Sequence, residues 1–587
     1  MEQCLIADPD RPIYHVMAAR GWINDPNGPI FHDGRYHLFY QHLPDSTKWE
    51  FGIVWGHVVS TDLATWSHLP IAITPSPGQR DADGCFSGCC VLDENDQPTI
   101  LYTGVRLRGN PDVGELPPPD YDLELTFFET QCCAARGGVS LPPADLLPAN
   151  KLAGWRDPFI FEKRKTPEGL TEYGMLLGSG FKEEGGATLV YRSTSVLSGW
   201  RYDGMLCKAK SMATGLMWEC PLLADLSSTT QGASRDHLFC ISPDAPTKKV
   251  IYWLGEYKEG RFLLEDAVGP FELDLGDTLY APNILVDSAG RALMWGWIQE
   301  RNRKSDKANY SGCMTVPRVL SIKKGHLLQE PAPEIKLLRK EGGSLDGFPT
   351  TLSARTPVEL VGPKGRSIDI EAVFEQGTSA MAGLFIRSWS LGKEGSVAIL
   401  YDWKLNTLEA IYGFDPSICG DQHHDQFSGL RRTGGELPTE KCSTLSLRLI
   451  IDGSCVEAYT SLGAVMSVRV YRGKKPAEGF PLDATKNDKT LPSAHPGVFD
   501  SDAGSGIWCV CVGGEAQVSS LSAWEMKCAW TKESSESNEW VQPCEEHDLV
   551  PVTMRAPYGV RVGRCMACDG LHGHGYCPAG ESAQCHG

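Results

Sequence analysis

The chain has 587 residues, of which 41% are hydrophobic and 22% are charged, values typical of a globular protein rather than a disordered or fibrous one. Its formal net charge of -19 argues against a nucleic-acid partner, because phosphate backbones are bound by clustered Lys and Arg. No run approaches the roughly 20 apolar residues that cross a bilayer, so we expect no membrane partner.

The first residues and the cysteines bear on the compartment. The start, MEQCLIADPDRPIYHVMAARGW, lacks the basic and then apolar order of a signal peptide. The 21 cysteines mostly stand singly in strand-like runs, where a reduced thiol acts as a small hydrophobe, and their odd number excludes complete pairing within one chain. We therefore expect a mostly reduced protein, and the cytoplasm is favoured over secretion.

Short runs rich in aromatic and β-branched residues fill the chain from about residue 20 to about 320. Examples are RYHLFYQH (35–42), GIVWGHVVST (52–61), TILYTGV (99–105), KVIYWLGEY (249–257) and ALMWGWIQE (292–300). Such runs, bounded by Gly, Pro, Asn and Asp, predict strands, and no long period of 3.6 residues competes with them. So many short strands favour a β-propeller, because radial blades leave few open sheet edges.

A composition change at residues 326–347, where prolines and glycines interrupt a Leu/Ile/Lys pattern, predicts a connection between two domains. Apolar and polar residues alternate beyond it, in SIDIEAVFEQ (367–376), AGLFIRSW (382–389), SVAILYDW (396–403) and TLSLRLIID (444–452). This pattern predicts a β-sandwich whose strands have one buried and one wet face. The expected division of this all-β chain is a propeller at 1–325, a linker at 326–347, a sandwich at 348–530 and a polar tail at 531–587.

The tail is rich in potential metal ligands, namely Cys565, Cys568, His572, His574, Cys577 and Cys585. The first two cysteines have the spacing of a zinc-binding pair, but the second half lacks a regular spacing. A zinc site, disulfides and a disordered tail all stay open as interpretations.

Three acidic residues stand in tight segments of Gly, Pro and aromatic residues: Asp25 in GWINDPNG, Asp157 in GWRDPF and Glu219 in MWECP. We expect such segments at strand ends. An Asp before Pro is commonly structural, with its carboxylate capping backbone N–H groups, but three such sites together favour a functional role. Each acid also follows closely on a residue type that can line a sugar pocket or fill a core: Trp22, Trp155 and Trp218.

Glycoside hydrolysis needs one carboxyl that keeps a proton and a second that is ionised. The apolar neighbours of Glu219 suit the proton donor, because an apolar setting raises the pKa of a carboxyl. The turn amides expected around Asp25 suit the ionised partner.

At these motifs the chain resembles a known family. GWINDPNG is similar to the WMNDPNG signature of glycoside hydrolase family 32, the invertase and fructan-hydrolase family, and RDP (156–158) and WECP (218–221) match its other acidic motifs. Further matches are FYQH (39–42), Trp49, WGHVVSTDLATW (55–66), CFSG (85–88) and DLGDTLYAP (274–282). The resemblance covers residues 12 to about 525.

The resemblance implies a five-bladed propeller followed by a β-sandwich, with no metal and no cofactor. It implies Asp25 as nucleophile, Glu219 as acid/base and Asp157 as transition-state stabiliser. The residues that it places around the fructosyl unit are Asn24, Gln41, Trp49, Phe86, Ser87 and Arg156. The charge of Arg156 should in addition hold Asp157 ionised.

The expected reaction is retaining hydrolysis of the terminal β-fructosyl bond of sucrose or a short fructan, through a covalent fructosyl-enzyme. Retention predicts Asp25 and Glu219 carboxyls roughly 5 to 5.5 Å apart. A fructosyltransferase shares the first half-reaction and stays an alternative, whereas a silent sugar-binding relative should have lost one of the three acids. The choice between sucrose and fructan and the oligomeric state stay open.

Four positions depart from the family pattern. Ile23 replaces the usual Met, which is a mild apolar exchange. Cys89 and Cys90 follow the FSG segment, and we expect them to be packing residues near the pocket. Asp277 stands where plant invertases tend to carry a basic residue, so a preference for sucrose does not follow from this segment.

Overall fold

The structure is a computed structural model that describes residues 8–530 of the chain. The gaps within that range are 9, 112–122, 124, 135–151, 230–234, 245–248, 302–307, 341–342, 344, 346, 355, 364–365, 388–395, 417–426, 428 and 472–505. The predicted tail at 531–587, with its Cys and His residues, lies outside the described residues.

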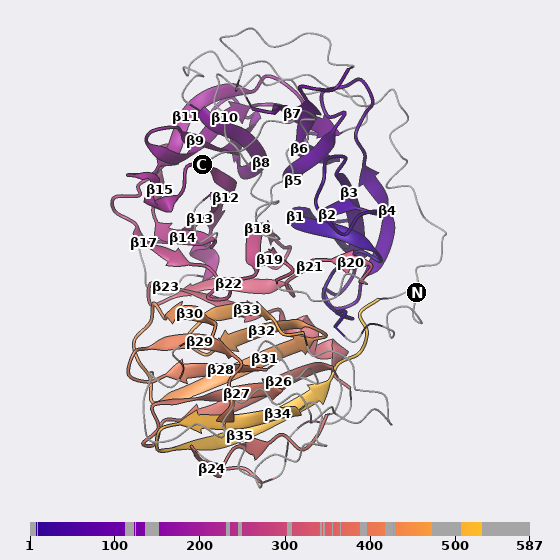
Figure 1. Ribbon diagram of the computed structural model, residues 1–587. Helices are drawn as coiled ribbons and strands as arrows, with labels where there is room; N and C mark the ends of the chain where they lie inside the picture. Colours follow the sequence, from indigo (N-terminus) through magenta and orange to yellow (C-terminus); the bar gives the residue numbers. More distant parts are fainter. Residues whose placement is uncertain are drawn as a thin grey trace, which may run out of the picture.

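The chain forms a β-propeller followed by a β-sandwich, the upper and lower halves of Figure 1. The described helices are short 3-10 helices, η3 (Met212–Thr214), η4 (Ser227–Thr229) and η5 (Pro333–Leu338). None of the described helices has the length and apolar character needed to cross a membrane. The predicted all-β class is therefore confirmed.

Five sheets make up the described propeller. The first contains β20 (Tyr310–Ser311), β1 (Gly21–His32), β2 (Arg35–Leu43), β3 (Val54–Ser60) and β4 (Ser67–Ile73). The second contains β5 (Gly84–Leu92), β6 (Pro98–Leu107) and β7 (Phe127–Ala134). The third contains β8 (Leu152–Lys165), β9 (Thr171–Phe181), β10 (Gly185–Ser193) and β11 (Arg201–Lys208).

The fourth sheet contains β12 (Trp218–Asp225), β13 (His237–Pro243), β14 (Ile251–Gly255) and β17 (Val268–Glu272). The fifth contains β18 (Leu279–Val286), β19 (Ala292–Ile298), β21 (Cys313–Met314), β22 (Arg318–Lys323) and β23 (His326–Pro331). A separate ribbon pairs β15 (Tyr257–Lys258) with β16 (Arg261–Phe262). The strands predicted at 35–42, 52–61, 99–105, 249–257 and 292–300 all occur, as β2, β3, β6, β14 and β19.

The innermost strands β1, β5, β8, β12 and β18 contact one another in a ring, each with the next and the last with the first. The late strand β20 pairs in parallel with β1, so the end of the propeller segment is joined to its beginning. The count of five blades stays a prediction, because segments between these strands lie outside the described residues.

The sandwich has two six-stranded sheets. One contains β24 (Thr350–Ser353), β35 (Glu515–Glu525), β26 (Ser367–Glu375), β31 (Thr444–Asp452), β32 (Cys455–Thr460) and β33 (Val465–Arg469). The other contains β25 (Val358–Glu359), β34 (Gly506–Val512), β27 (Met381–Arg387), β28 (Val397–Asp402), β29 (Thr407–Tyr412) and β30 (Arg432–Glu436).

The prediction that each sandwich strand has one solvent-exposed face is confirmed for only some of these strands. The first half of β31 alternates between exposed and buried residues, as expected. In contrast, β28 is buried throughout. Its Ile399 packs in the core between the sheets, while Leu400 packs in a second apolar cluster with Phe385 and Trp508. A central strand covered on both sides gives the continuous apolar run that its sequence shows.

Propeller and sandwich share a buried contact. An apolar cluster contains propeller residues such as Trp295 and sandwich residues such as Tyr459. Within this contact the Arg318 guanidinium of β22 lies 2.7 Å from Glu457 of β32 and 2.9 Å from Asp274. The predicted linker at 326–347 includes β23, which pairs with β22 of the propeller, so the domain boundaries stay a proposal.

Candidate active site

Each of the five innermost strands has a β-bulge at which it contains one more residue than its neighbour. The extra residue lies between Ile23 and Pro26 in β1, Cys85 and Gly88 in β5, Arg156 and Phe159 in β8, Glu219 and Leu222 in β12, and Tyr280 and Asn283 in β18. Such bulges re-aim side chains and are frequent beside active sites. The five bulges bring together all three acidic motifs.

These bulges correct the expectation that the acids lie at strand ends. Asp25 and Asp157 lie within β1 and β8, and only Glu219 lies near the beginning of its strand. A proline lies in the bulge or at its end in four of the five strands, as Pro26, Pro158, Pro221 and Pro282. Proline has no N–H for the sheet ladder, so a bulge is one of the few places where it fits inside a sheet.

The backbone at three bulges adopts a conformation that is unusual for residues with side chains. The φ angles are 63° at Asp157, 45° at Cys220 and 45° at Ala281. Backbone of this kind clusters at functional sites, where the surrounding fold holds it in place.

Asp25 receives hydrogen bonds on both carboxylate oxygens. Ser87 Oγ donates to Oδ2 at 2.5 Å, and Asn24 Nδ2 donates to Oδ1 at 3.1 Å. The pKa of Asp25 is nevertheless raised, because burial outweighs these two hydrogen bonds and the Glu219 charge acts in the same direction as burial. The donors that hold the carboxylate are thus mainly side chains, although turn amides had been expected.

A chain of amide and hydroxyl groups connects the donors around Asp25. Asn24 Nδ2 also donates to Gln41 Oε1 at 2.8 Å, and Gln41 Nε2 donates to Ser87 Oγ at 2.6 Å. Trp22 Nε1 donates to Asn24 Oδ1 at 2.8 Å, which fixes the amide orientation. The structure therefore brings the predicted residues Asn24, Gln41 and Ser87 together around Asp25.

Glu219 is only 8% exposed and is held by two groups. Arg156 Nη2 donates to Oε1 at 2.6 Å, and Tyr280 Oη donates to Oε2 at 2.6 Å. The second terminal nitrogen of Arg156, Nη1, donates to Glu129 Oε1 at 2.8 Å. The guanidinium thus bridges a catalytic candidate and a buried carboxylate of β7.

Asp157 is buried as well, with 6% of its surface exposed. Burial raises its pKa to about 7, with a further upward contribution from Glu219, although the Arg156 charge lowers it. Its Oδ2 accepts a hydrogen bond from Cys220 N at 2.9 Å. Arg156 thus favours the ionised form of Asp157 as expected, but burial outweighs this effect. The guanidinium itself pairs with Glu129 and Glu219.

The Cys220 thiol lies between two of the acids. Its Sγ atom is 3.7 Å from Asp25 Oδ2 and 3.7 Å from Asp157 Oδ2. Burial and both carboxylates raise the pKa of this thiol well above its ordinary value, so it remains a neutral S–H donor.

Three residues of this cluster had not been singled out from the sequence: Tyr280, Glu129 and Cys220. The segment from Tyr280 to Pro282 repeats the pattern of an innermost strand interrupted by proline, a signal that could have pointed to it. Glu129 stands in FFETQCC, which has no such signal, and only the contact between β7 and β8 brings it to Arg156.

The predicted residues Trp49 and Phe86 belong to an aromatic group beside Ser87. The Trp49 ring is 6.2 Å from that of Phe86, and Phe51 and Phe127 complete the group at 6.4 and 5.9 Å from Phe86. Trp22, Trp155 and Trp218 are at most 1% exposed, so these three are core residues and do not line a pocket.

The positions that depart from the family pattern lie in packed surroundings. Ile23 is 1% exposed, and Cys89 packs in the propeller core. Cys90 packs beside the smaller apolar cluster of the first two sheets, so both thiols are packing residues as expected. Asp277 forms an ion pair with Arg431 of the sandwich, which places it at the contact between the two halves.

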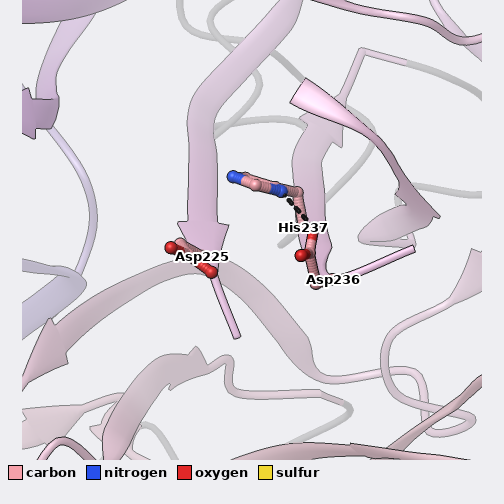
Figure 2. A group of neighbouring side chains, drawn as sticks. All are labelled: Asp225, Asp236 and His237. Atoms are coloured by element: carbon pink, nitrogen blue, oxygen red, sulfur yellow. Dashed lines mark hydrogen bonds and ion pairs between the residues drawn. The ribbon is translucent and has the colours of Figure 1, made fainter. Parts of the chain in front are cut away.

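One other group of described residues has donors close enough to hold a metal ion: Asp225, Asp236 and His237. Figure 2 shows Asp225 near the end of β12 opposite the imidazole of His237. Asp236 already accepts a hydrogen bond from His237 at 2.6 Å, and Asp225 accepts one from Ser227 N at 2.8 Å. The group lies six residues along β12 from Glu219, roughly 20 Å away, so it has no part in the acidic cluster.

Comparisons with known proteins agree with this arrangement. Residues 15–331 match the profile of the glycosyl hydrolases family 32 N-terminal domain, and residues 334–495 match that of the family 32 C-terminal domain. The chain is 30% identical to the sucrose-6-phosphate hydrolase of Escherichia coli over 479 residues, which are 78% of this chain and 89% of that protein. It is 31% identical to beta-fructofuranosidase 1 of Zea mays over 517 residues, 78% of this chain and 74% of that protein.

Solved structures support the fold. A fructan 1-exohydrolase of Cichorium intybus in complex with 1-kestose superposes with a TM-score of 0.67 at 22% identity, covering 90% of this chain and 99% of that one. A beta-fructofuranosidase of Bombyx mori superposes with a TM-score of 0.63 at 22% identity, covering 89% of this chain and 95% of that one.

Proposed function

The chain belongs to glycosyl hydrolase family 32, and we propose that it hydrolyses the terminal β-fructosyl bond of sucrose or a short fructan with retention of configuration. The observation that carries the proposal is the cluster of Asp25, Asp157 and Glu219 at three bulges of the propeller ring. Each acid has its own set of hydrogen-bond partners, which is what a division of roles requires.

Asp25 is the proposed nucleophile. Both of its oxygens accept hydrogen bonds from neutral donors, Ser87 and Asn24, which stabilise the ionised form and fix the direction of attack. Attack on the anomeric carbon forms a covalent fructosyl-enzyme and breaks the bond to the leaving sugar.

Glu219 is the proposed acid/base. It protonates the departing oxygen in the first step and activates water in the second. Arg156 and Tyr280 hold one oxygen each, so the carboxyl is fixed in orientation during both steps. The carboxyls lie close enough for the Glu219 charge to raise the pKa of both Asp25 and Asp157. Their mutual repulsion therefore favours a state in which one carboxyl of the cluster is protonated.

Asp157 is the proposed transition-state stabiliser, positioned to bind fructosyl hydroxyl groups. With a pKa of about 7, its carboxyl exists in both protonation states near neutral pH. The substrate hydroxyls add hydrogen bonds that favour the ionised form. The separation of the Asp25 and Glu219 carboxyls stays a prediction of roughly 5 to 5.5 Å.

Product analysis tests the function. The wild type should release fructose from sucrose, or from inulin-type or levan-type oligomers, and Asp25→Asn and Glu219→Gln should each lose this activity. Sucrose 6-phosphate belongs in the same assay, because relatives of this chain carry the name sucrose-6-phosphate hydrolase. Unchanged activity in either variant would refute the roles given to Asp25 and Glu219. Longer fructans as the main product at high sucrose concentration would favour the fructosyltransferase alternative.

A further inference from the structure

Two buried thiols meet where the propeller packs on the sandwich. Cys313 lies in β21 of the propeller and Cys455 begins β32 of the sandwich, and each is 0% exposed. Arg469 of β33 lies opposite Cys455 in the β32–β33 ladder and donates a hydrogen bond to Cys313 Sγ. The same arginine therefore joins a thiol of the propeller and a thiol of the sandwich.

Cationic side chains flank the pair on both sides. Arg469 Nη2 donates to Cys313 Sγ at 3.2 Å, and His15 Nε2 lies 3.5 Å from Cys455 Sγ. The His15 ring is held by Asp452 at 2.9 Å and Glu457 at 3.1 Å. Although burial lowers the pKa of His15, these two carboxylates raise it to about 10, so the ring is charged at neutral pH.

This setting distinguishes the two thiols from each other. Burial raises the pKa of Cys313, but the neighbouring Cys455 side chain and the charges of Arg469 and His15 outweigh burial and lower the pKa overall. The pKa of Cys455 is well above its ordinary value, mainly through burial. The guanidinium N–H that points at Cys313 Sγ favours Cys313 as the nucleophilic partner and Cys455 as the proton-bearing one.

Two other buried cysteines among the described residues, Cys240 and Cys509, lack this arrangement. For Cys509 burial alone raises the pKa of the thiol to about 12, and for Cys240 burial alone raises it as well. Because the thiolate is the reactive form, these two residues are matched controls of equal burial and low reactivity.

We propose that Cys313 and Cys455 form an oxidisable pair, which becomes a disulfide between propeller and sandwich when the protein is exposed to hydrogen peroxide. The Cys313 thiolate attacks one peroxide oxygen, the O–O bond breaks, and a sulfenic acid forms with release of hydroxide. The Cys455 sulfur then attacks the Cys313 sulfur, the S–O bond breaks, and a second hydroxide leaves. The hydroxide ions take up the thiol protons, so two thiols and one peroxide give one disulfide and two waters.

The bridge would join the sandwich to the segment that supports the nucleophile. Ser311, two residues before Cys313, pairs with Trp22 in β1, and Gly312 packs so closely on Ile23 that a Cβ atom there would lie 2.5 Å from the Ile23 carbonyl oxygen. The oxidised pair would therefore link β32 to the strand that carries Asp25.

Mass spectrometry of the full-length protein tests this proposal. The protein is treated with hydrogen peroxide, unfolded in the presence of an alkylating agent and digested without reduction. We expect a peptide pair joined through Cys313 and Cys455 that separates on reduction, with the pair about tenfold more oxidised than Cys240 or Cys509. Oxidation of Cys313 and Cys455 no greater than that of the two controls would overturn the proposal, as would their separate oxidation without a cross-link.

Two variants test the assigned order of the steps. In Cys455→Ser a sulfenic acid should accumulate on Cys313, where dimedone can label it. In Cys313→Ser the remaining Cys455 should stay a thiol. Labelling of Cys455 in Cys313→Ser, with no labelling of Cys313 in Cys455→Ser, would contradict the roles given to the two residues.

Discussion

Replacing Asp157 by Asn should stabilise the protein while it removes activity. The carboxyl is 6% exposed, and its pKa is about 7 in the fold against an ordinary value of 3.8. Asn keeps the shape of the side chain, and its amide oxygen can accept the hydrogen bond from Cys220 N. The variant therefore removes a buried charge and little else.

The size of the effect depends on pH. In the unfolded chain Asp157 is ionised above about pH 4, whereas in the fold it is ionised only above about pH 7. The resulting loss of folding free energy is about 2 kcal/mol at pH 5.5 and about 4 kcal/mol at pH 8, as an upper estimate. Stability is thus lost as pH rises through this window, and the variant should gain about 2 kcal/mol more over the wild type at pH 8 than at pH 5.5.

Urea unfolding followed by tryptophan fluorescence at the two pH values measures this difference. Asp45→Asn is the matched control, because the Asp45 side chain is 86% exposed and its change should have the same small effect at both pH values. In the same preparations kcat of Asp157→Asn should fall by about 10²- to 10³-fold. A stability difference between Asp157→Asn and the wild type that does not change with pH would refute the reasoning.

Three other substitutions have defined outcomes. Ser87→Ala removes a hydrogen bond that lowers the pKa of Asp25, so the acid limb of the pH profile of kcat/KM should move to higher pH. An acid limb at the wild-type pH would contradict the role of Ser87 in stabilising ionised Asp25. Tyr280→Phe removes the hydroxyl that donates to Glu219 Oε2, so kcat should fall roughly tenfold with little change in KM. An unchanged kcat would show that this hydrogen bond does not contribute to catalysis. Arg318→Met leaves the buried carboxylates of Asp274 and Glu457 without their guanidinium partner. The free energy of unfolding, measured with heat or urea, should fall by about 3 to 5 kcal/mol. A loss below about 1 kcal/mol would contradict the importance of this ion cluster.

Local pattern was sufficient to predict most of the strands. The runs at 35–42 and 444–452 coincide with β2 and β31, because aromatic and β-branched residues with period two suit a pleated, partly buried strand. The solvent-exposed face predicted for the strand at 396–403 is absent, because β28 is buried throughout. Whether a strand is covered on its second face depends on residues distant in sequence, here Phe385 and Trp508 against β28.

The three acids could be found from their motifs, but their surroundings could not. A bulge is a difference in residue number between two paired strands, so the sequence of one strand does not reveal it. The local sign of these bulges is the proline that follows Asp25, Asp157 and Cys220. The pairing of Arg156 with Glu129 and Glu219 depends on three separate sheets. Sequence reasoning placed Arg156 near the acids but did not reveal that its direct partners are Glu129 and Glu219.

Trapping of the covalent intermediate tests the central claim most directly. Glu219→Gln is incubated with β-fructosyl fluoride, whose leaving group needs no acid, so the fructosyl-enzyme should form and persist without its base. After an acid quench and digestion, the peptide that contains Asp25 should carry one fructosyl unit, and the same peptide from Asp25→Asn with Glu219→Gln should carry none. An adduct on the peptide that contains Asp157, or release of product with inverted configuration, would contradict the account.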